Sequence, residues 1–390
     1  MFENVEAVVS VFPDKIVDEI PTRNVVLVVS GECNLRCRYC YEHFKRKGEM
    51  SLATAKRVVR DEFRGIANQK GWKLRFEMMG GEPLLNFPLV RELSEWMWLN
   101  FDDSLYEICI QTNGTVLTEN SKRWLSENRA KISVSCSFDG FSEMNEYNRG
   151  NTAGNIGYFR ENWPNEPVSV TLFPDSVKWL HKTVSEMRNR GYAFTVQPAE
   201  GIVWDKEFVS VYVGQMDLVS QMYLGDYRGG VESGLLSFDP LDYFQCASLG
   251  TTEFCGHRQL NVAYDVEGRA YFCHLFTPLA MGRQVAERAK KELSGVEYVK
   301  IDSQCELCPV KMMCRPCPGY RYKLRKDINS CVERITICNF IRAKAFVCAK
   351  HFMKEFEENV RRGGSVDNDD VIRAKKAIDY IEYYQNSKEV

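Results

Sequence analysis

CNLRCRYC, residues 33–40, places three cysteines at the spacing C-x3-C-x2-C. Three thiolates at this spacing can hold three irons of a 4Fe–4S cube and leave the fourth iron open for a chelating ligand. The apolar run Val25–Val29 precedes the stretch and predicts a buried strand, with the cysteines in the loop that follows it. A zinc knuckle is the alternative, because C-x2-C pairs often bind zinc. The triplet spacing is unusual for zinc and favours iron–sulfur.

The 390-residue chain has the composition of a globular protein, with 44% hydrophobic and 27% charged residues. Its length suits two domains, or one large barrel with an extension. A net charge of −2 gives no reason to expect a nucleic-acid partner. No apolar run reaches the roughly 18–20 residues of a membrane span. The N-terminal residues 1–14 lack the basic start of a secretory signal, so we expect a cytoplasmic protein without a membrane partner.

Strand and helix patterns alternate through the first half of the chain. Helix-type periodicity spans residues 51–63, 89–98 and 118–128. Strand-like runs span residues 25–30, 74–78, 107–111, 132–138, 168–172 and 192–196. This alternation predicts an α/β fold with a parallel sheet. Polar residues cluster where these strands end, which is where α/β barrels place their sites.

The cysteine triplet acquires a family context from a second motif. Tyr39 stands just before the third cysteine, and the sequence GGEP, residues 80–83, follows about one strand–helix–strand unit later. Together they resemble the radical S-adenosylmethionine (radical SAM) superfamily, over about residues 24–350. The resemblance implies an open partial (β/α)6 barrel, and the number of predicted strands agrees.

The resemblance also implies which residues bind the SAM cofactor. Cys33, Cys37 and Cys40 would hold the SAM-binding 4Fe–4S cluster. The segment Gly80, Gly81, Glu82 and Pro83 would bind the amino group of SAM, since glycines allow close backbone approach. Tyr39 would lie near the adenine.

Three further polar residues are candidates for the rest of the cofactor. Asn113 and Ser137 could bind the ribose or the carboxylate, and Arg149 could pair with the carboxylate through its forked guanidinium. The alternatives are a simple turn for GGEP, an asparagine bonded to its own backbone, and an arginine on the surface.

Asp139 is the candidate catalytic residue. It ends the predicted strand at residues 132–138, in the sequence SFDG, which resembles a stretch of the anaerobic sulfatase-maturating enzymes in which the aspartate is the proposed base. A carboxylate at the mouth of a barrel can act as a general base or anchor a substrate. A turn or helix N-cap aspartate is the alternative.

Nine of the 15 cysteines lie between residues 246 and 338. Their order resembles the SPASM extension, which holds auxiliary 4Fe–4S clusters, although Cys314 and Cys317 are one residue closer than in that pattern. The resemblance assigns Cys246, Cys255, Cys273 and Cys317 to one cluster. It assigns Cys305, Cys308, Cys314 and Cys338 to another, with Cys331 competing for the last position. Two zinc sites are the alternative, since tetrathiolate zinc is common.

These motifs divide the chain into five parts. We expect an N-terminal extension at 1–23, the partial barrel at 24–200, a linker helix and loop at 201–245, a cysteine-rich SPASM-type iron–sulfur domain at 246–350, and C-terminal helices at 351–390.

The resemblance implies a radical SAM enzyme that cleaves SAM reductively and takes a hydrogen atom from a peptide or protein. The modification would be a crosslink, a thioether, a formylglycine-type oxidation or an epimerisation. Its partners would be the substrate, an electron donor such as flavodoxin or ferredoxin, and possibly a separate peptide-recognition protein. The alternatives are a reaction on a small molecule or a modified nucleobase, and a non-catalytic metal-binding scaffold.

Overall fold

The computed structural model describes residues 21–69, 71–150, 155–225, 233–236, 240, 251–252, 260–296, 299–300, 305, 308–311, 313–314, 317–328 and 336–387. Three cysteines of the second group, Cys246, Cys255 and Cys331, lie outside these residues. Within the described residues no helix is both long enough and apolar enough to cross a membrane.

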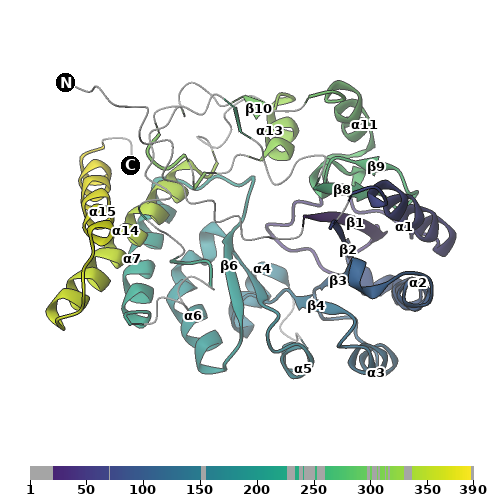
Figure 1. Cartoon of the computed structure of the whole chain (residues 1–390), viewed down its shortest axis with the longest axis horizontal. Coiled ribbons are helices and arrows are strands. Elements are labelled where there is room, and N and C mark those ends of the chain that lie inside the picture. Colours follow the sequence, from purple (N-terminus) through teal and green to yellow (C-terminus); the bar gives the residue numbers. More distant parts are fainter. Residues whose placement is uncertain are drawn as a thin grey trace.

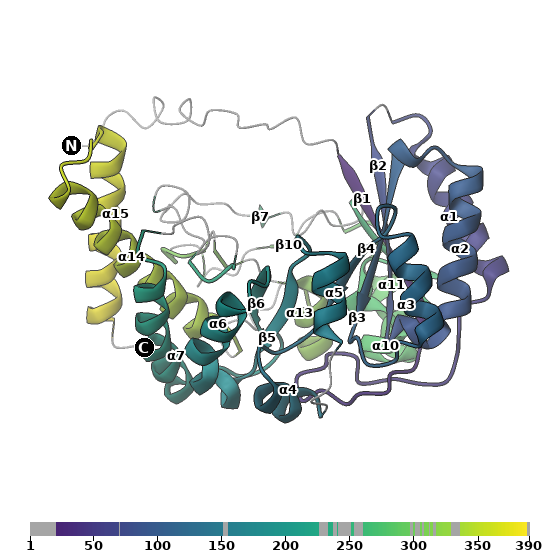
Figure 2. The same cartoon turned by 90° about the horizontal axis from the view of Figure 1, so that it is seen from below.

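The centre of the fold is a parallel sheet that begins with β1 (Thr22–Ser30), β2 (Lys73–Gly80), β3 (Tyr106–Thr112) and β4 (Ser133–Cys136). These strands are hydrogen-bonded neighbours in the order β4-β3-β2-β1. The connecting helices are α1 (Leu52–Ile66), α2 (Phe87–Asn100) and α3 (Glu119–Glu127), and they cover the outer face of the sheet (Figures 1 and 2). The predicted alternation of strands and helices is confirmed.

Two more parallel strands extend the curve of this sheet. β5 (Val168–Leu172) pairs with β6 (Phe194–Pro198), and an isolated parallel bridge joins Ser137, just after β4, to Ser169. The intervening helices are α4 (Ser142–Arg149), α5 (Ile156–Asn162) and α6 (Leu180–Asn189). The six strands form the arc of an open barrel, as predicted (Figure 2).

A short strand that the sequence did not predict borders the other edge of the sheet. β8 (Asn261–Tyr264) pairs in parallel with β1, and β9 (Ala270–Tyr271) pairs antiparallel with β8. The cysteine-rich region predicted as a separate domain therefore contributes directly to the main sheet.

The other described residues of the C-terminal half are mainly helical. α7 (Lys206–Met222), α14 (Cys338–Arg361) and α15 (Asn368–Asn386) pack together, with Tyr212 and Phe340 buried between them. The shorter elements are β7 (Thr251–Thr252), α10 (Pro278–Met281), α11 (Arg283–Glu292), β10 (Val299–Lys300) and α13 (Pro318–Arg325).

The two faces of the central strands differ in chemistry. On β2, Leu74, Phe76 and Met78 are fully buried against the helices. Arg75, Glu77 and Met79 alternate with them and are less buried. Because successive side chains point to opposite faces of a strand, this second set faces the inside of the barrel. The apolar outer face builds the core and leaves the inner face available for a site.

Candidate active site

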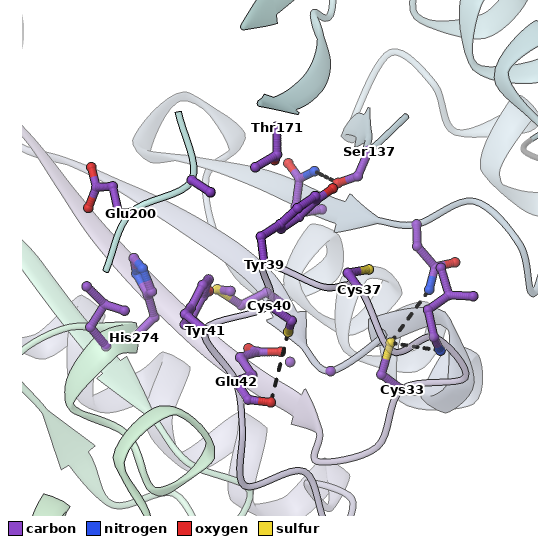
Figure 3. Close-up of a pocket in the computed structure, with 18 of the residues that line it drawn as sticks. Cys33, Cys37, Tyr39, Cys40, Tyr41, Glu42, Ser137, Thr171, Glu200 and His274 are labelled. Atoms are coloured by element: carbon purple, nitrogen blue, oxygen red, sulfur yellow. Dashed lines mark hydrogen bonds between the residues drawn. The ribbon is translucent and has the colours of Figure 1, made fainter. Parts of the chain in front are cut away.

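A cavity of about 630 Å³ lies inside the barrel at the carboxyl ends of the strands. Its wall combines the cysteine loop, the ends of β2, β3 and β6, and residues around α13. Figure 3 shows Cys33, Cys37 and Cys40 on one side and Glu200 and His274 on the other. Residues that are far apart in the sequence therefore face one space.

The three cysteines of the loop all line this cavity as free, half-buried thiols. Burial raises the pKa of Cys33, and it raises the pKa of Cys37 to about 11. The loop is tied to the barrel by a 2.8 Å hydrogen bond from the Arg38 backbone N–H to the Asn148 carbonyl oxygen. The predicted grouping of the three cysteines at the end of β1 is present.

The GGEP segment packs directly against the start of the cysteine loop. A Cβ atom on Gly80 would clash with the Ser30 carbonyl oxygen, and one on Gly81 would clash with that of Glu32. Gly80 also has a φ of +147°, which favours glycine. These glycines therefore let two backbone segments of the protein pack closely against each other at the floor of the cavity.

Glu82 has both carboxylate oxygens occupied by protein donors. One oxygen accepts from Leu84 N–H at 3.0 Å and from the Thr112 hydroxyl at 2.6 Å, and the other accepts from Asn113 N–H at 2.8 Å. Burial raises its pKa, although these hydrogen bonds act in the opposite direction. Glu82 joins the ends of β2 and β3, and Pro83 begins a short 3-10 helix after it. Contact with SAM stays a prediction for both.

Asn113 and Ser137 line the cavity but already have local partners. The Asn113 side-chain oxygen accepts a 2.9 Å hydrogen bond from Thr115 N–H, as turn asparagines often do. The Ser137 hydroxyl accepts from the Gln111 amide at 2.8 Å. Their cofactor contacts stay predictions.

Asp139 is completely buried and is not among the residues that line the cavity. Four donors surround its carboxylate. Oδ2 accepts from the Tyr39 hydroxyl at 2.7 Å and the Asn148 amide at 3.0 Å. Oδ1 accepts from Arg149 Nη2 at 3.1 Å and Thr171 N–H at 3.0 Å. The predicted role as a base is untested, and this geometry makes Asp139 a link between four separate segments.

Arg149 lies between Asp139 and the cavity, whose wall it lines. Its guanidinium carbon is 5.4 Å from the centre of the Tyr39 ring. Its buried Nε has no hydrogen-bond partner among the described residues. Burial acts to lower the pKa of Arg149, but Asp139, Tyr39 and Cys37 together raise it above its usual range. A buried cation therefore lies at the wall of the cavity, beside the cysteine loop.

Only part of the second cysteine group reaches this cavity. Cys273 and Cys317 line it, opposite the cysteine loop. Cys317 and Cys314 also line a neighbouring cavity of about 250 Å³. Cys305, Cys308 and Cys338 are described but line neither cavity. Because Cys246 and Cys255 are outside the described residues, the assignment of the auxiliary ligands stays a prediction.

Several residues of the wall were not predicted from the sequence. His274 follows Cys273, and its ring is 5.4 Å from that of Tyr41. Burial lowers the pKa of His274 to about 4, so its imidazole is neutral at pH 7. Glu200 lies two residues after β6 and Tyr320 is on α13. Glu200 could have been predicted as a site residue from its position just beyond a strand end. His274 and Tyr320 belong to no motif that would have identified them.

Comparisons with known proteins agree with this architecture. The family model of the Radical SAM superfamily matches residues 27–173. Over 113 residues the chain is 32% identical to the uncharacterised protein MJ0907 of Methanocaldococcus jannaschii, a match that covers 29% of this chain and 38% of that protein. Over 143 residues it is 29% identical to the cysteine-type anaerobic sulfatase-maturating enzyme of Clostridium perfringens strain 13, covering 34% and 37%. These matches span about two fifths of either relative's length.

A longer and weaker match is to a probable GTP 3′,8-cyclase of Methanococcus maripaludis strain C6. It is 22% identical over 259 residues and covers 62% of this chain and 82% of that enzyme.

Two solved structures share the fold. Native anSMEcpe with bound AdoMet and Cp18Cys peptide superposes with a TM-score of 0.55 and 18% identity, over 88% of this chain and 98% of that chain. Streptococcus suis SuiB bound to the precursor peptide SuiA gives a TM-score of 0.51 and 14% identity, over 80% and 74%. Residues 27–173, which include the cysteine loop, therefore form a radical SAM domain.

Proposed function

We propose that the protein is a radical SAM enzyme that takes a hydrogen atom from a peptide or protein substrate. The observation that carries the proposal is that Cys33, Cys37 and Cys40 all line one cavity, together with Arg149, which is paired with Asp139. A bound 4Fe–4S cluster with SAM on its open iron would supply one-electron cleavage of SAM to a 5′-deoxyadenosyl radical.

The arrangement of the thiols fits a cluster better than a single ion. Among the described residues, no three histidine, cysteine or carboxylate side chains converge as the ligands of one metal ion do. A cube is held by three separate thiolates, one on each of three irons, and the loop offers three free thiols along one wall.

The residues around the loop would hold and orient SAM. Arg149 lines the cavity with its guanidinium held in place by Asp139, and its positive charge would attract the carboxylate. The backbone around Gly80 and Gly81 forms the adjacent floor, where carbonyl oxygens could accept from the amino group. Tyr39, fixed by its hydrogen bond to Asp139, would limit the position of the adenine.

A peptide substrate is supported by the relatives and by the shape of the cavity. Sulfatase-maturating relatives and the peptide-bound anSMEcpe and SuiB structures act on or bind peptides by their names. Here the cavity continues from the cysteine loop to Glu200, His274 and Tyr320, which leaves room for a substrate side chain beyond the cofactor. The proposal also covers the modification, which would be one of the four types named above, and the delivery of the peptide by a separate recognition protein.

The second cysteine group would hold auxiliary iron–sulfur clusters. Cys273 and Cys317, with Cys246 and Cys255, would place one cluster at the wall of the cavity, where it could accept an electron from the substrate radical that hydrogen abstraction leaves. Cys305, Cys308, Cys314 and Cys338 would hold the second. Reductive cleavage also requires an electron from outside, so a flavodoxin- or ferredoxin-type donor belongs to the proposal.

A nucleotide substrate is the second candidate, because the match to a probable GTP 3′,8-cyclase covers 82% of that enzyme. The cavity gives it less support than it gives a peptide. Among the described residues of the wall, the cationic ones are Lys45 and Arg149, and Arg149 is already paired with Asp139. A triphosphate would need more positive charge than this pair supplies.

The test is anaerobic turnover of the reconstituted protein with SAM and dithionite, followed by chromatography for 5′-deoxyadenosine. Pools of synthetic peptides that contain cysteine or serine are compared with GTP, and mass spectrometry follows each probe. We expect 5′-deoxyadenosine from the wild type, and a mass change in a peptide. Modification of GTP alone would support the second candidate. Absence of SAM cleavage would contradict both and favour a non-catalytic scaffold.

A further inference from the structure

Lys45 follows the cysteine loop in the sequence and lines the same cavity as the three thiols. The backbone beside it is anchored, because Arg46 N–H donates a 2.9 Å hydrogen bond to the Gly31 carbonyl oxygen at the end of β1. From this anchor the half-buried side chain reaches back to the loop, where its Nζ lies 3.5 Å from the carbonyl oxygen of Leu35. A cation is therefore held against the middle of the C-x3-C segment.

The charge of Lys45 acts on all three cysteines of the loop. The ammonium group interacts electrostatically with Cys33, Cys37 and Cys40, and each interaction is attractive toward the thiolate. On Cys33, the effect of Lys45 is larger than the opposing effect of Glu82. No other residue on the wall of the cavity has this relation to the whole triplet among the described residues.

The neighbouring charges do not cancel that of Lys45. Arg149 acts on Cys37 in the same direction, but it is paired with Asp139, which acts on the same thiol in the opposite direction. Glu42 lines the cavity and interacts with Lys45. Among the described residues, however, Lys45 forms no ion pair with Glu42 or with any other carboxylate. Its positive charge is therefore directed at the thiols of the loop.

A fixed cation at this place has a definite effect on an iron–sulfur cluster. Reduction adds one electron and makes the cluster more negative, so a nearby positive charge stabilises the reduced form more than the oxidised form. Net charge and solvent exposure are among the factors that set the reduction potential of such clusters. The effect is stronger in a cavity than in open water, because the lower local dielectric constant screens charges less.

We infer that Lys45 is the counter-charge of the iron–sulfur cluster at the cysteine loop and that its positive charge raises the reduction potential of that cluster. The inference rests on the proposed function, which places this cluster on Cys33, Cys37 and Cys40. In this role Lys45 is a positioning residue that acts through the cluster. The reduction transfers one electron to the cluster and leaves the lysine unchanged.

Two other uses of Lys45 make different predictions. A lysine that binds the carboxylate of SAM would change the affinity for SAM and leave the potential of the SAM-free cluster unchanged. A lysine that only supports the loop through the Leu35 carbonyl oxygen would change the stability of the loop, and its charge would not affect the potential.

The test is an anaerobic redox titration without SAM, followed by electron paramagnetic resonance. The signal that is lost in the Cys33→Ala, Cys37→Ala, Cys40→Ala triple variant identifies the cluster of the loop. Lys45→Met removes the charge and keeps an unbranched side chain, whereas Lys45→Arg keeps the charge. The control is Lys47→Met, which makes the same change two residues further on, at an exposed position outside the cavity. Iron and sulfide are quantified for each protein.

We expect the ratio of reduced to oxidised cluster at a fixed potential to be about tenfold lower in Lys45→Met than in the wild type, which corresponds to a midpoint potential about 59 mV lower. Lys45→Arg and Lys47→Met should keep the wild-type midpoint. The signals that persist in the triple variant should titrate alike in all proteins. Equilibrium dialysis of the oxidised proteins should show that Lys45→Met retains its affinity for SAM.

An unchanged midpoint in Lys45→Met would overturn the inference, and so would an equal shift in Lys47→Met. Weaker binding of SAM with an unchanged midpoint would assign Lys45 to the carboxylate of SAM instead. If Lys45→Met does not hold the cluster, Lys45→Arg decides: recovery of about four irons would support the counter-charge, since a cube holds four, and no recovery would overturn it. A wild type without any signal that depends on the three cysteines would contradict the proposed function itself.

Discussion

The hydroxyl of Tyr39 donates a 2.7 Å hydrogen bond to the carboxylate of Asp139, 100 residues further along the chain. Tyr39 stands between Cys37 and Cys40, so this bond fixes the cysteine loop to the end of β4. Arg149 pairs with the same carboxylate and lines the cavity. A single buried anion thus positions both the loop and the proposed binding site for SAM.

Replacing Asp139 tests this positioning role. Asp139→Asn would leave the buried Arg149 cation without its counter-charge, and breaking a buried pair in this way costs roughly 3–5 kcal/mol. We expect the free energy of unfolding, measured anaerobically in urea, to fall by about that amount. Glu143→Gln, at an exposed position of α4, is the matched control and should change little. A stable Asp139→Asn protein that forms 5′-deoxyadenosine but no product would instead support the role as a base.

The glycines of the GGEP segment should tolerate no side chain. Gly80→Ala and Gly81→Ala each force a Cβ against a backbone carbonyl, and overpacking of this kind costs about 1–3 kcal/mol. Gly65→Ala on α1 has open space around its Cβ and should raise the free energy of unfolding by about 0.5–1 kcal/mol. Equal effects at the three positions in urea unfolding would contradict the observed packing.

Arg149→Lys tests the proposed contact with the SAM carboxylate. Lysine keeps a positive charge but loses the fork and the unused Nε donor, so we expect SAM to bind about tenfold more weakly. Equilibrium dialysis of the iron-loaded protein with labelled SAM measures the affinity. Arg129→Lys, at an exposed position near the amino end of β4 and away from the cavity, serves as the control. An unchanged affinity of Arg149→Lys for SAM would show that the carboxylate of SAM binds elsewhere.

A buried histidine between α7 and α14 should make stability depend on pH. His351 Nδ1 lies 2.9 Å from the Ser220 hydroxyl, and burial lowers its pKa below the ordinary value of 6.5. The unfolded chain therefore binds a proton more readily than the folded one, and the stability is complete above the unfolded pKa and is lost as the pH falls below it. Urea unfolding at pH 7.5 and 5.5 should show this loss. His351→Gln should have a smaller pH dependence, and an identical one would exclude His351 as its source.

Much of the barrel was predictable because local sequence determines its strands. The continuous apolar run of β1 predicts a strand buried on both faces, and the alternation of β2 predicts a strand buried on one face. The cysteine loop was recognised from the spacing of its cysteines. β8 was not predictable. It has only four residues, Asn261–Tyr264, in a region rich in polar residues, and it becomes a strand through its pairing with β1.

The chemistry of the site was less predictable than its location. Asp139 and Glu82 were found at strand ends, but their saturated hydrogen bonds depend on donors from segments up to 100 residues away. His274 and Tyr320 reach the cavity only because β8 and α13 fold back over the barrel. Contacts between distant segments leave no periodic pattern in the sequence, so a motif can locate a residue without revealing its partners.

The central claim is that Cys33, Cys37 and Cys40 hold one iron–sulfur cube and that the second cysteine group holds two more. Anaerobic iron and sulfide quantification of the wild type and of the Cys33→Ala, Cys37→Ala, Cys40→Ala triple variant tests it most directly. With four irons in each cube, we predict about twelve irons per chain in the wild type and about eight in the variant. Equal iron in both proteins would contradict the assignment of the first cluster, and about four irons with bound zinc in the wild type would contradict the auxiliary clusters.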